Sequence, residues 1–149
     1  AQPWIDLIRK YAPDTLLLVG GPRWCQNMSG AIQNPFSGNN IVYSAHCYPD
    51  HLKDFNKNWG DLIDKYPVFF TEWGYENPGQ TPWNGTTENF GIPFKKIIER
   101  YGLSWCAWCF DSDWPPRIFD RNWQLFEDKE NYMSFFTKEW LKESMEKYK

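Results

Sequence analysis

Short continuous runs of apolar residues alternate along the chain with longer segments in which apolar residues recur every three or four positions. Four such runs, at residues 15–19, 41–45, 67–71 and 103–109, are bounded by glycine, proline or polar residues. Continuous apolar runs of this length are typical of strands that are covered on both faces, as in parallel sheets. The pattern therefore predicts four buried strands.

The segments around these runs have the periodicity of helices that bury one face. Helices are predicted over residues 1–11, 52–66, 86–101 and 131–148, and Gly102 ends the third of them. Between 52 and 66 the inward positions are Leu52, Phe55, Trp59, Leu62 and Ile63. Strands that alternate with helices at this spacing indicate right-handed βαβ units, so we expect one α/β domain with a parallel sheet over residues 1–149.

The composition narrows the range of functions that the chain could have. The 149 residues carry a net charge of −3 with no basic stripe, which argues against nucleic acid as a partner, and no apolar run has the length of a membrane span. Aromatic residues make up 19% of the chain, with 10 Trp. Tryptophans at this density can form flat platforms on which pyranose rings stack, although some of them must belong to the core.

The cysteines give little support for a metal site. They are Cys25, Cys47, Cys106 and Cys109. The last two have the spacing of a zinc-binding pair, but only His46 and His51 could supply further ligands, so we expect neither metal nor cofactor. The first two follow the ends of neighbouring strands and could approach each other, and the sequence leaves their redox state open.

A single carboxylate, Glu72, stands where the run 67–71 meets a loop rich in proline and glycine. The carboxyl ends of the strands in a parallel sheet are where α/β proteins place their chemistry. Side chains alternate along a strand, so Val68, Phe70 and Glu72 are expected to share one face. From position alone, Glu72 is either a reactive group or a residue that caps a turn.

The other three predicted strands also end in polar or aromatic residues. These are Arg23 and Trp24, then His46 and Tyr48, then Trp108 and Asp111. Any one of them is more often structural than functional. Four such ends on one rim indicate a binding face, and we include Arg23 among the candidate substrate-binding residues.

Taken together, the four segments resemble a known family. Residues 15–26 (TLLLVGGPRWCQ), 40–48 (NIVYSAHCY), 67–74 (PVFFTEWG) and 103–110 (LSWCAWCF) are similar, in order, to the fifth to eighth strands of the cellulase-type catalytic barrel of glycoside hydrolase family 5. The resemblance implies half of a (β/α)8 TIM barrel and a retaining endo-β-1,4-glucanase that acts on β-linked polysaccharides or oligosaccharides. Such enzymes use two carboxylates about 5 Å apart.

The same resemblance assigns roles to individual residues. Glu72 corresponds to the nucleophile, and His46 and Tyr48 to residues that hold its charge in place. Trp108 corresponds to the tryptophan that stacks under the sugar being cleaved, and Trp24 to a platform for a neighbouring sugar. Because polymeric glycans lie outside the cell, an extracellular location is expected.

The chain departs from the family in one respect. The family keeps its acid/base glutamate in an Asn-Glu-Pro segment on the fourth strand, and residues 76–78 have these letters in another order after the nucleophile. Half a barrel leaves bare strand edges and an open apolar face. We expect either a second copy to close it as a homodimer, which would bring the partner's Asp111 or Asp113 near the place of the acid, or a complementary N-terminal half.

Two alternatives stay open. The chain could be a non-catalytic glycan-binding half-barrel that uses Trp24 and Trp108, or it could share only the fold and have a structural role.

Overall fold

The computed structural model describes residues 1–126, 129–136, 138 and 141–147. Its centre is a parallel sheet of four strands in the order β1-β2-β3-β5. The strands are β1 (Leu17–Gly20), β2 (Ile41–Cys47), β3 (Val68–Trp73) and β5 (Ser104–Trp105). A separate antiparallel pair joins β4 (Glu76–Asn77) to β6 (Glu130–Asn131). The predicted α/β class and its parallel sheet are confirmed.

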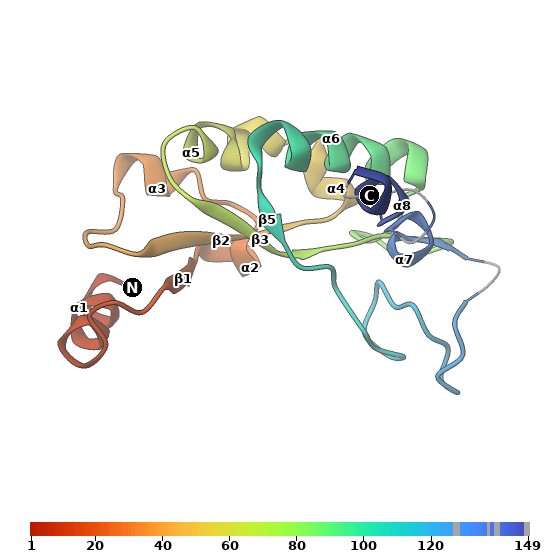
Figure 1. The fold of residues 1–149 in the computed structure, drawn as a ribbon, viewed down its shortest axis with the longest axis horizontal. Coiled ribbons are helices and arrows are strands. Elements are labelled where there is room, and N and C mark those ends of the chain that lie inside the picture. Colours follow the sequence, from red (N-terminus) through yellow and green to blue (C-terminus); the bar gives the residue numbers. More distant parts are fainter. Residues whose placement is uncertain (127–128, 137, 139–140, 148–149) are drawn as a thin grey trace.

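The helices are mostly short. They are α1 (Gln2–Tyr11), α2 (Pro22–Cys25), α3 (Gly30–Gln33), α4 (Pro49–Leu52), η1 (Asn56–Gly60), α5 (Asp61–Ile63), η2 (Thr87–Gly91), α6 (Ile92–Tyr101), α7 (Tyr132–Phe135) and α8 (Leu141–Lys147). Figure 1 shows α3, α4, α5 and α6 along one face of the sheet, with α1 beside β1. Within the described part of the chain, no helix combines the length and the apolarity that a bilayer crossing requires.

The core lies between the sheet and these helices. Phe70 of β3 is fully buried, and its ring packs on Phe55, Trp59 and Phe94 at centroid distances of 5.9, 5.6 and 5.3 Å. The opposite face of the sheet is less covered: Leu18 of β1 remains 43% exposed. The sheet therefore buries one face within this chain and presents the other.

Two predicted elements are shorter than expected. The helix over 52–66 is divided into α4, η1 and α5, although its inward residues Phe55, Trp59 and Leu62 are buried as predicted. The predicted strand over 103–109 is wrong beyond Trp105, where β5 ends. The chain still follows β3, because the amides of Cys106 and Trp108 donate to the carbonyls of Phe70 and Trp73, both at 2.8 Å.

The helix expected over residues 131–148 is α7 and α8, and part of the segment between them lies outside the described residues. Asn131 begins α7 because its Oδ1 accepts the amides of Met133 and Ser134, each at 3.0 Å. The helix pair η2–α6 has equally clear ends. Thr86 caps its start, and Gly102 ends it with a φ of 61°, which suits glycine.

Candidate active site

A β-bulge turns Glu72 away from the core. Ala45 pairs with Phe70 and His46 with Glu72, so that Thr71 is an extra residue on β3. An extra residue reverses the alternation of side chains beyond it. The expectation that Phe70 and Glu72 share a face is therefore wrong: Phe70 lies in the core, and Glu72 lies on the face opposite the helices, beside His46.

Two side chains from the end of β2 hold one oxygen of Glu72. The Tyr48 hydroxyl donates to Oε2 at 2.7 Å, and Nδ1 of His46 lies 3.2 Å from the same atom. Burial lowers the pKa of His46, and the nearby Glu72 charge raises it to a smaller extent. Burial, followed by the hydrogen bond to Glu72, raises the pKa of Tyr48, so its hydroxyl keeps the proton that it donates.

Tyr48 is itself supported by His51. The Tyr48 amide donates to Nδ1 of His51 at 3.3 Å, and the two rings meet edge to face with centroids 5.9 Å apart. Burial is the largest cause of a lowered pKa at His51. A neutral imidazole is also what this contact requires, since Nδ1 must accept.

The two histidines predict a pH dependence of stability. Both have a folded pKa below the ordinary value of 6.5, so below about pH 6.5 the unfolded chain binds more protons than the folded one. The free energy of unfolding is therefore expected to fall as the pH drops from 7.5 to 5.5, and the melting temperature with it. Calorimetry of the parent and of a His46→Asn/His51→Gln variant checks this. An equally steep fall in the double variant would assign the effect to other groups.

Glu72 lies in a cleft of about 530 Å³, here called the Glu72 cleft. Its lining residues are Trp24, Gln26, His46, Tyr48, Glu72, Pro82, Trp83, Trp108, Trp114 and Pro115. The structure thus brings together five of the predicted site residues, from four strand ends. It adds Trp83, Trp114 and Gln26, which the sequence left without a role. Their only signal was that they lie in loops that follow predicted strands.

The turn after β1 presents Trp24 to the cleft. Arg23, Trp24 and Cys25 have φ values of 52°, 51° and 60°, in the left-handed region that side chains other than glycine rarely adopt. Trp24 is 80% exposed. Strained backbone of this kind is concentrated at functional sites. Arg23 is exposed too but does not line the cleft, and its role in binding stays a prediction.

Asp111 and Asp113 have local partners. Oδ1 of Asp111 accepts the amides of Asp113 and Trp114 at 2.6 and 3.1 Å, and these backbone hydrogen bonds lower the pKa of Asp111. Asp113 pairs with Arg121 at 3.5 Å on the surface. A carboxylate that is stabilised in its charged form is a poor proton donor, so this geometry weighs against Asp111 as an acid for a partner copy.

The cysteines are all free thiols, so Cys25 and Cys47 are not bonded to each other. Burial, with smaller contributions from Asp111 and Glu72, raises the pKa of the Cys109 thiol to about 12. It is therefore a poor nucleophile at neutral pH. The described residues contain no group of three or more His, Cys, Asp or Glu side chains that could hold a metal ion.

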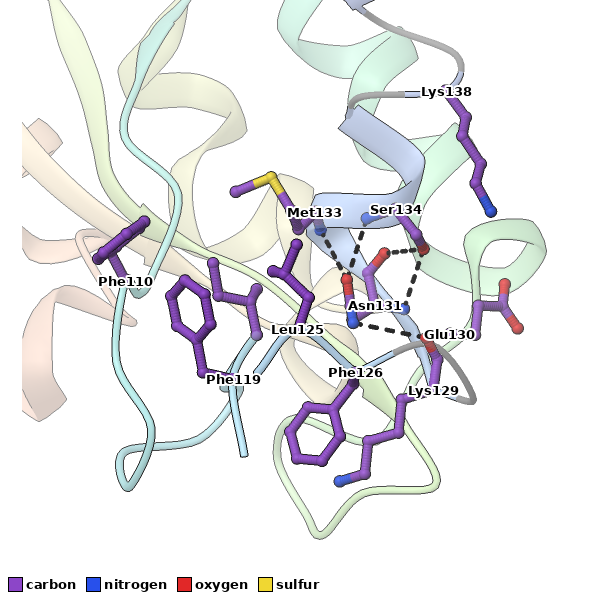
Figure 2. A pocket seen from close by; sticks show the side chains of 11 residues that line it. Phe110, Phe119, Leu125, Phe126, Lys129, Glu130, Asn131, Met133, Ser134 and Lys138 are labelled. Carbon is purple, nitrogen blue, oxygen red and sulfur yellow. Dashed lines mark hydrogen bonds between the residues drawn. The ribbon is translucent and has the colours of Figure 1, made fainter. Parts of the chain in front are cut away.

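A larger hollow, of about 770 Å³, lies near the C-terminal part of the chain. Figure 2 shows its apolar wall of Phe110, Phe119, Leu125 and Phe126. Its carboxylate, Glu130, accepts the amide of Thr87, and two of its other polar residues, Asn131 and Ser134, form the cap of α7. We therefore place the chemistry in the Glu72 cleft, where a carboxylate and tryptophans face the same space.

The profile of the Cellulase family, glycosyl hydrolase family 5, matches residues 1–113. The chain belongs to glycosyl hydrolase family 5. Endoglucanase Z of Dickeya dadantii is 32% identical over 108 residues, which cover 70% of this chain and 25% of that protein. An endoglucanase of Bacillus sp. (strain KSM-635) is 38% identical over 125 residues, 72% of this chain and 13% of that one. The family 5 chain thus spans a quarter or less of the length of these relatives.

Solved structures have the same fold. A β-glucanase from Saccharophagus degradans in complex with cellotetraose superposes with a TM-score of 0.80 and 26% identity, over 95% of this chain and 46% of that one. An endocellulase from Pyrococcus horikoshii superposes at a TM-score of 0.67 with 16% identity, a likeness of fold alone. The sheet and helices of this family 5 chain thus correspond to a four-stranded part of a TIM barrel.

Proposed function

We propose that this chain carries the nucleophile side of a retaining glycoside hydrolase that cleaves β-1,4-glucan, with Glu72 as the nucleophile. The observation that carries the proposal is the position of the Glu72 carboxylate, held by Tyr48 and His46 in a cleft lined by tryptophans. The endoglucanase relatives support it, as does the structurally similar β-glucanase that was solved with cellotetraose.

The contacts of Glu72 suggest how it would act. Tyr48 and His46 both approach Oε2, and no hydrogen bond to Oε1 is found among the described residues. Oε1 would attack the anomeric carbon and form a glycosyl-enzyme ester, while an acid on the opposite side protonates the departing glycosidic oxygen. Water, deprotonated by that same group, would then attack the anomeric carbon and release Glu72. The hydrogen bond from Tyr48 would stabilise the carboxylate whenever it is charged.

The acid/base group and the closure of the barrel are further parts of the proposal. A complementary N-terminal half would supply both the strands that are needed and the family's glutamate. A second copy of the chain would supply strands but no free acid, because Asp111 is committed to its own loop and Asp113 is paired with Arg121. Measuring the mass in solution by light scattering separates these cases. A monomer that hydrolyses β-glucan unaided would contradict both.

A second function is favoured by one observation: among the residues that the structure describes, Glu72 is the only carboxylate that lines the Glu72 cleft. A glycan-binding half-barrel would need only the tryptophans. Incubation of the closed assembly with cellohexaose distinguishes the two, because binding without new reducing ends selects the binding function and release of shorter sugars selects the hydrolase. Either function implies a polymeric ligand, so we also propose an extracellular location, which fractionation of the native source would test.

Replacing Tyr48 by Phe tests the support of the nucleophile. The change removes one hydrogen bond to a charged group, worth about 1.5–3 kcal/mol, and is expected to lower kcat/KM on soluble β-glucan by about 10- to 100-fold. Tyr101→Phe on α6, remote from the cleft, is the matched control and should leave kcat/KM unchanged. Equal rates for the two variants would mean that Tyr48 does not support Glu72 during the reaction.

A further inference from the structure

The loop that follows β5 is held rigid by its own polar groups. Asp111 accepts two backbone amides, including that of Trp114 at 3.1 Å, and the Cys109 thiol donates to the Trp114 carbonyl at 3.3 Å. Arg117 donates to the carbonyl of Ser112 at 3.3 Å. At the start of α7, the Tyr132 hydroxyl donates to the Cys109 carbonyl at 2.7 Å. Trp114 is thus fixed by contacts on its backbone, and none of these bonds uses its ring.

The ring of Trp114 stays largely in solvent although the backbone of its loop is held by hydrogen bonds. It is 67% exposed and lines the Glu72 cleft. An exposed indole leaves a large apolar surface in water, which is unfavourable by about 25 cal/mol per Å². An ordered loop that keeps such a ring exposed above a cleft is suited to a ligand with a flat apolar face, and a pyranose ring has one.

A second hollow adjoins the first. It measures about 480 Å³ and is called here the polar hollow. Pro115 lines both spaces, and Asp113 lines the polar hollow while the next residue, Trp114, lines the Glu72 cleft. On the other side both spaces are bordered by the loop after β3, through Gln80 in the polar hollow and Trp83 in the cleft. The same two loops therefore run along both spaces.

The charges of the polar hollow indicate the class of its ligand. Two acids, Glu76 and Asp113, line it with two bases, Arg117 and Lys129. Lys129 lies 3.5 Å from Glu76, so that much of this charge is already balanced. A hollow with balanced charge and many donors and acceptors suits a neutral ligand rich in hydroxyl groups better than a phosphate or a metal ion.

We propose that Trp114 is a sugar platform and that the polar hollow binds the next hexose units of the glucan chain held in the Glu72 cleft. The inference rests on the proposed function, because it extends the same glycan beyond the site of cleavage. It predicts that affinity keeps rising with chain length after the cleft itself is filled.

Calorimetric titration of the full 149-residue chain with cellobiose, cellotetraose and cellohexaose tests the inference. We expect cellohexaose to bind at least tenfold more tightly than cellotetraose, and Trp114→Ala to abolish that gain while cellobiose binds as before. Trp114→Phe should keep most of the gain, and Gln80→Ala should reduce it about threefold. Trp4→Ala, which removes a similarly exposed indole from α1, is the matched control. Melting temperatures establish that each variant is folded. If Trp114→Ala does not fold, Gln80→Ala still tests the polar hollow independently.

The outcomes separate this inference from the function on which it rests. If no oligosaccharide binds to the parent chain, the proposed function fails and the extension fails with it. If all of them bind and Trp114→Ala matches the parent at every length, the function stands and the extension is overturned. Equal weakening at every length, cellobiose included, also overturns it, because Trp114 would then belong to the central site alone.

Discussion

Glu72→Gln is expected to reduce hydrolysis of soluble β-glucan by the assembled enzyme by about four orders of magnitude or more. The amide is nearly the same size as the carboxylate and can still accept the hydrogen bond from Tyr48, which now measures 2.7 Å. It cannot form the glycosyl ester. Release of reducing ends, measured in the assembly that shows turnover, gives the rate.

The control for this variant is Glu88→Gln, which makes the same chemical change at an exposed position in η2. It should leave both activity and melting temperature unchanged. The melting temperature of Glu72→Gln should also stay close to that of the parent. Turnover within tenfold of the parent rate would remove Glu72 from the mechanism, and with it the proposed hydrolase.

Phe70→Ala is expected to destabilise the chain by about 3–5 kcal/mol, the largest effect on folding that we predict. Phe70 is fully buried at the centre of the sheet and touches three other aromatic rings. Its removal leaves a cavity between β3, η1 with its N-cap Phe55, and α6, which the three neighbouring rings cannot easily fill. Urea denaturation measures the loss. Since small domains are stable by only about 5–15 kcal/mol, part of the population should be unfolded at physiological temperature.

Two further variants serve as comparisons for Phe70→Ala. Phe70→Leu retains most of the volume and should lose clearly less stability than the alanine variant. Tyr11→Ala removes an aromatic ring that is 84% exposed on α1 and should change the free energy of unfolding by no more than about 0.5 kcal/mol. A loss below 1 kcal/mol for Phe70→Ala would show that this residue is not at the centre of the core.

Much of the architecture could be predicted from the sequence because its signals are local. The runs around Val68 and Val42 are apolar and bounded by turn residues, and both form strands of the sheet. Thr86 and Gly102 mark the ends of the helix between the third and fourth strands. The segment after Trp105 could not be assigned in this way. Its residues suit a strand, but there the backbone follows β3 without meeting the geometry of a full ladder.

Which strand ends form the candidate site could be predicted from the sequence, but the arrangement of their side chains could not. Alternation placed Glu72 on the wrong face, because nothing in the residues around Thr71 announces a bulge. The face could be corrected only through the pairing of β3 with β2, a contact between distant parts of the chain. Trp83 and Trp114 were missed for a similar reason: loops bring them to the cleft, and loop conformation has no periodicity that a sequence could reveal.

The hydroxyl of Tyr132 supports the carbonyl of Cys109, next to Trp108, and its amide donates to the carbonyl of Tyr75 just beyond β3. The wall of the Glu72 cleft that carries Trp108 therefore depends on a residue 23 positions further along the chain than Cys109. During synthesis the first three strands can pair while the remainder is still inside the ribosome. The cleft can be completed only after residue 132 has emerged, so a nascent chain that is released earlier would have its sheet but no finished binding site.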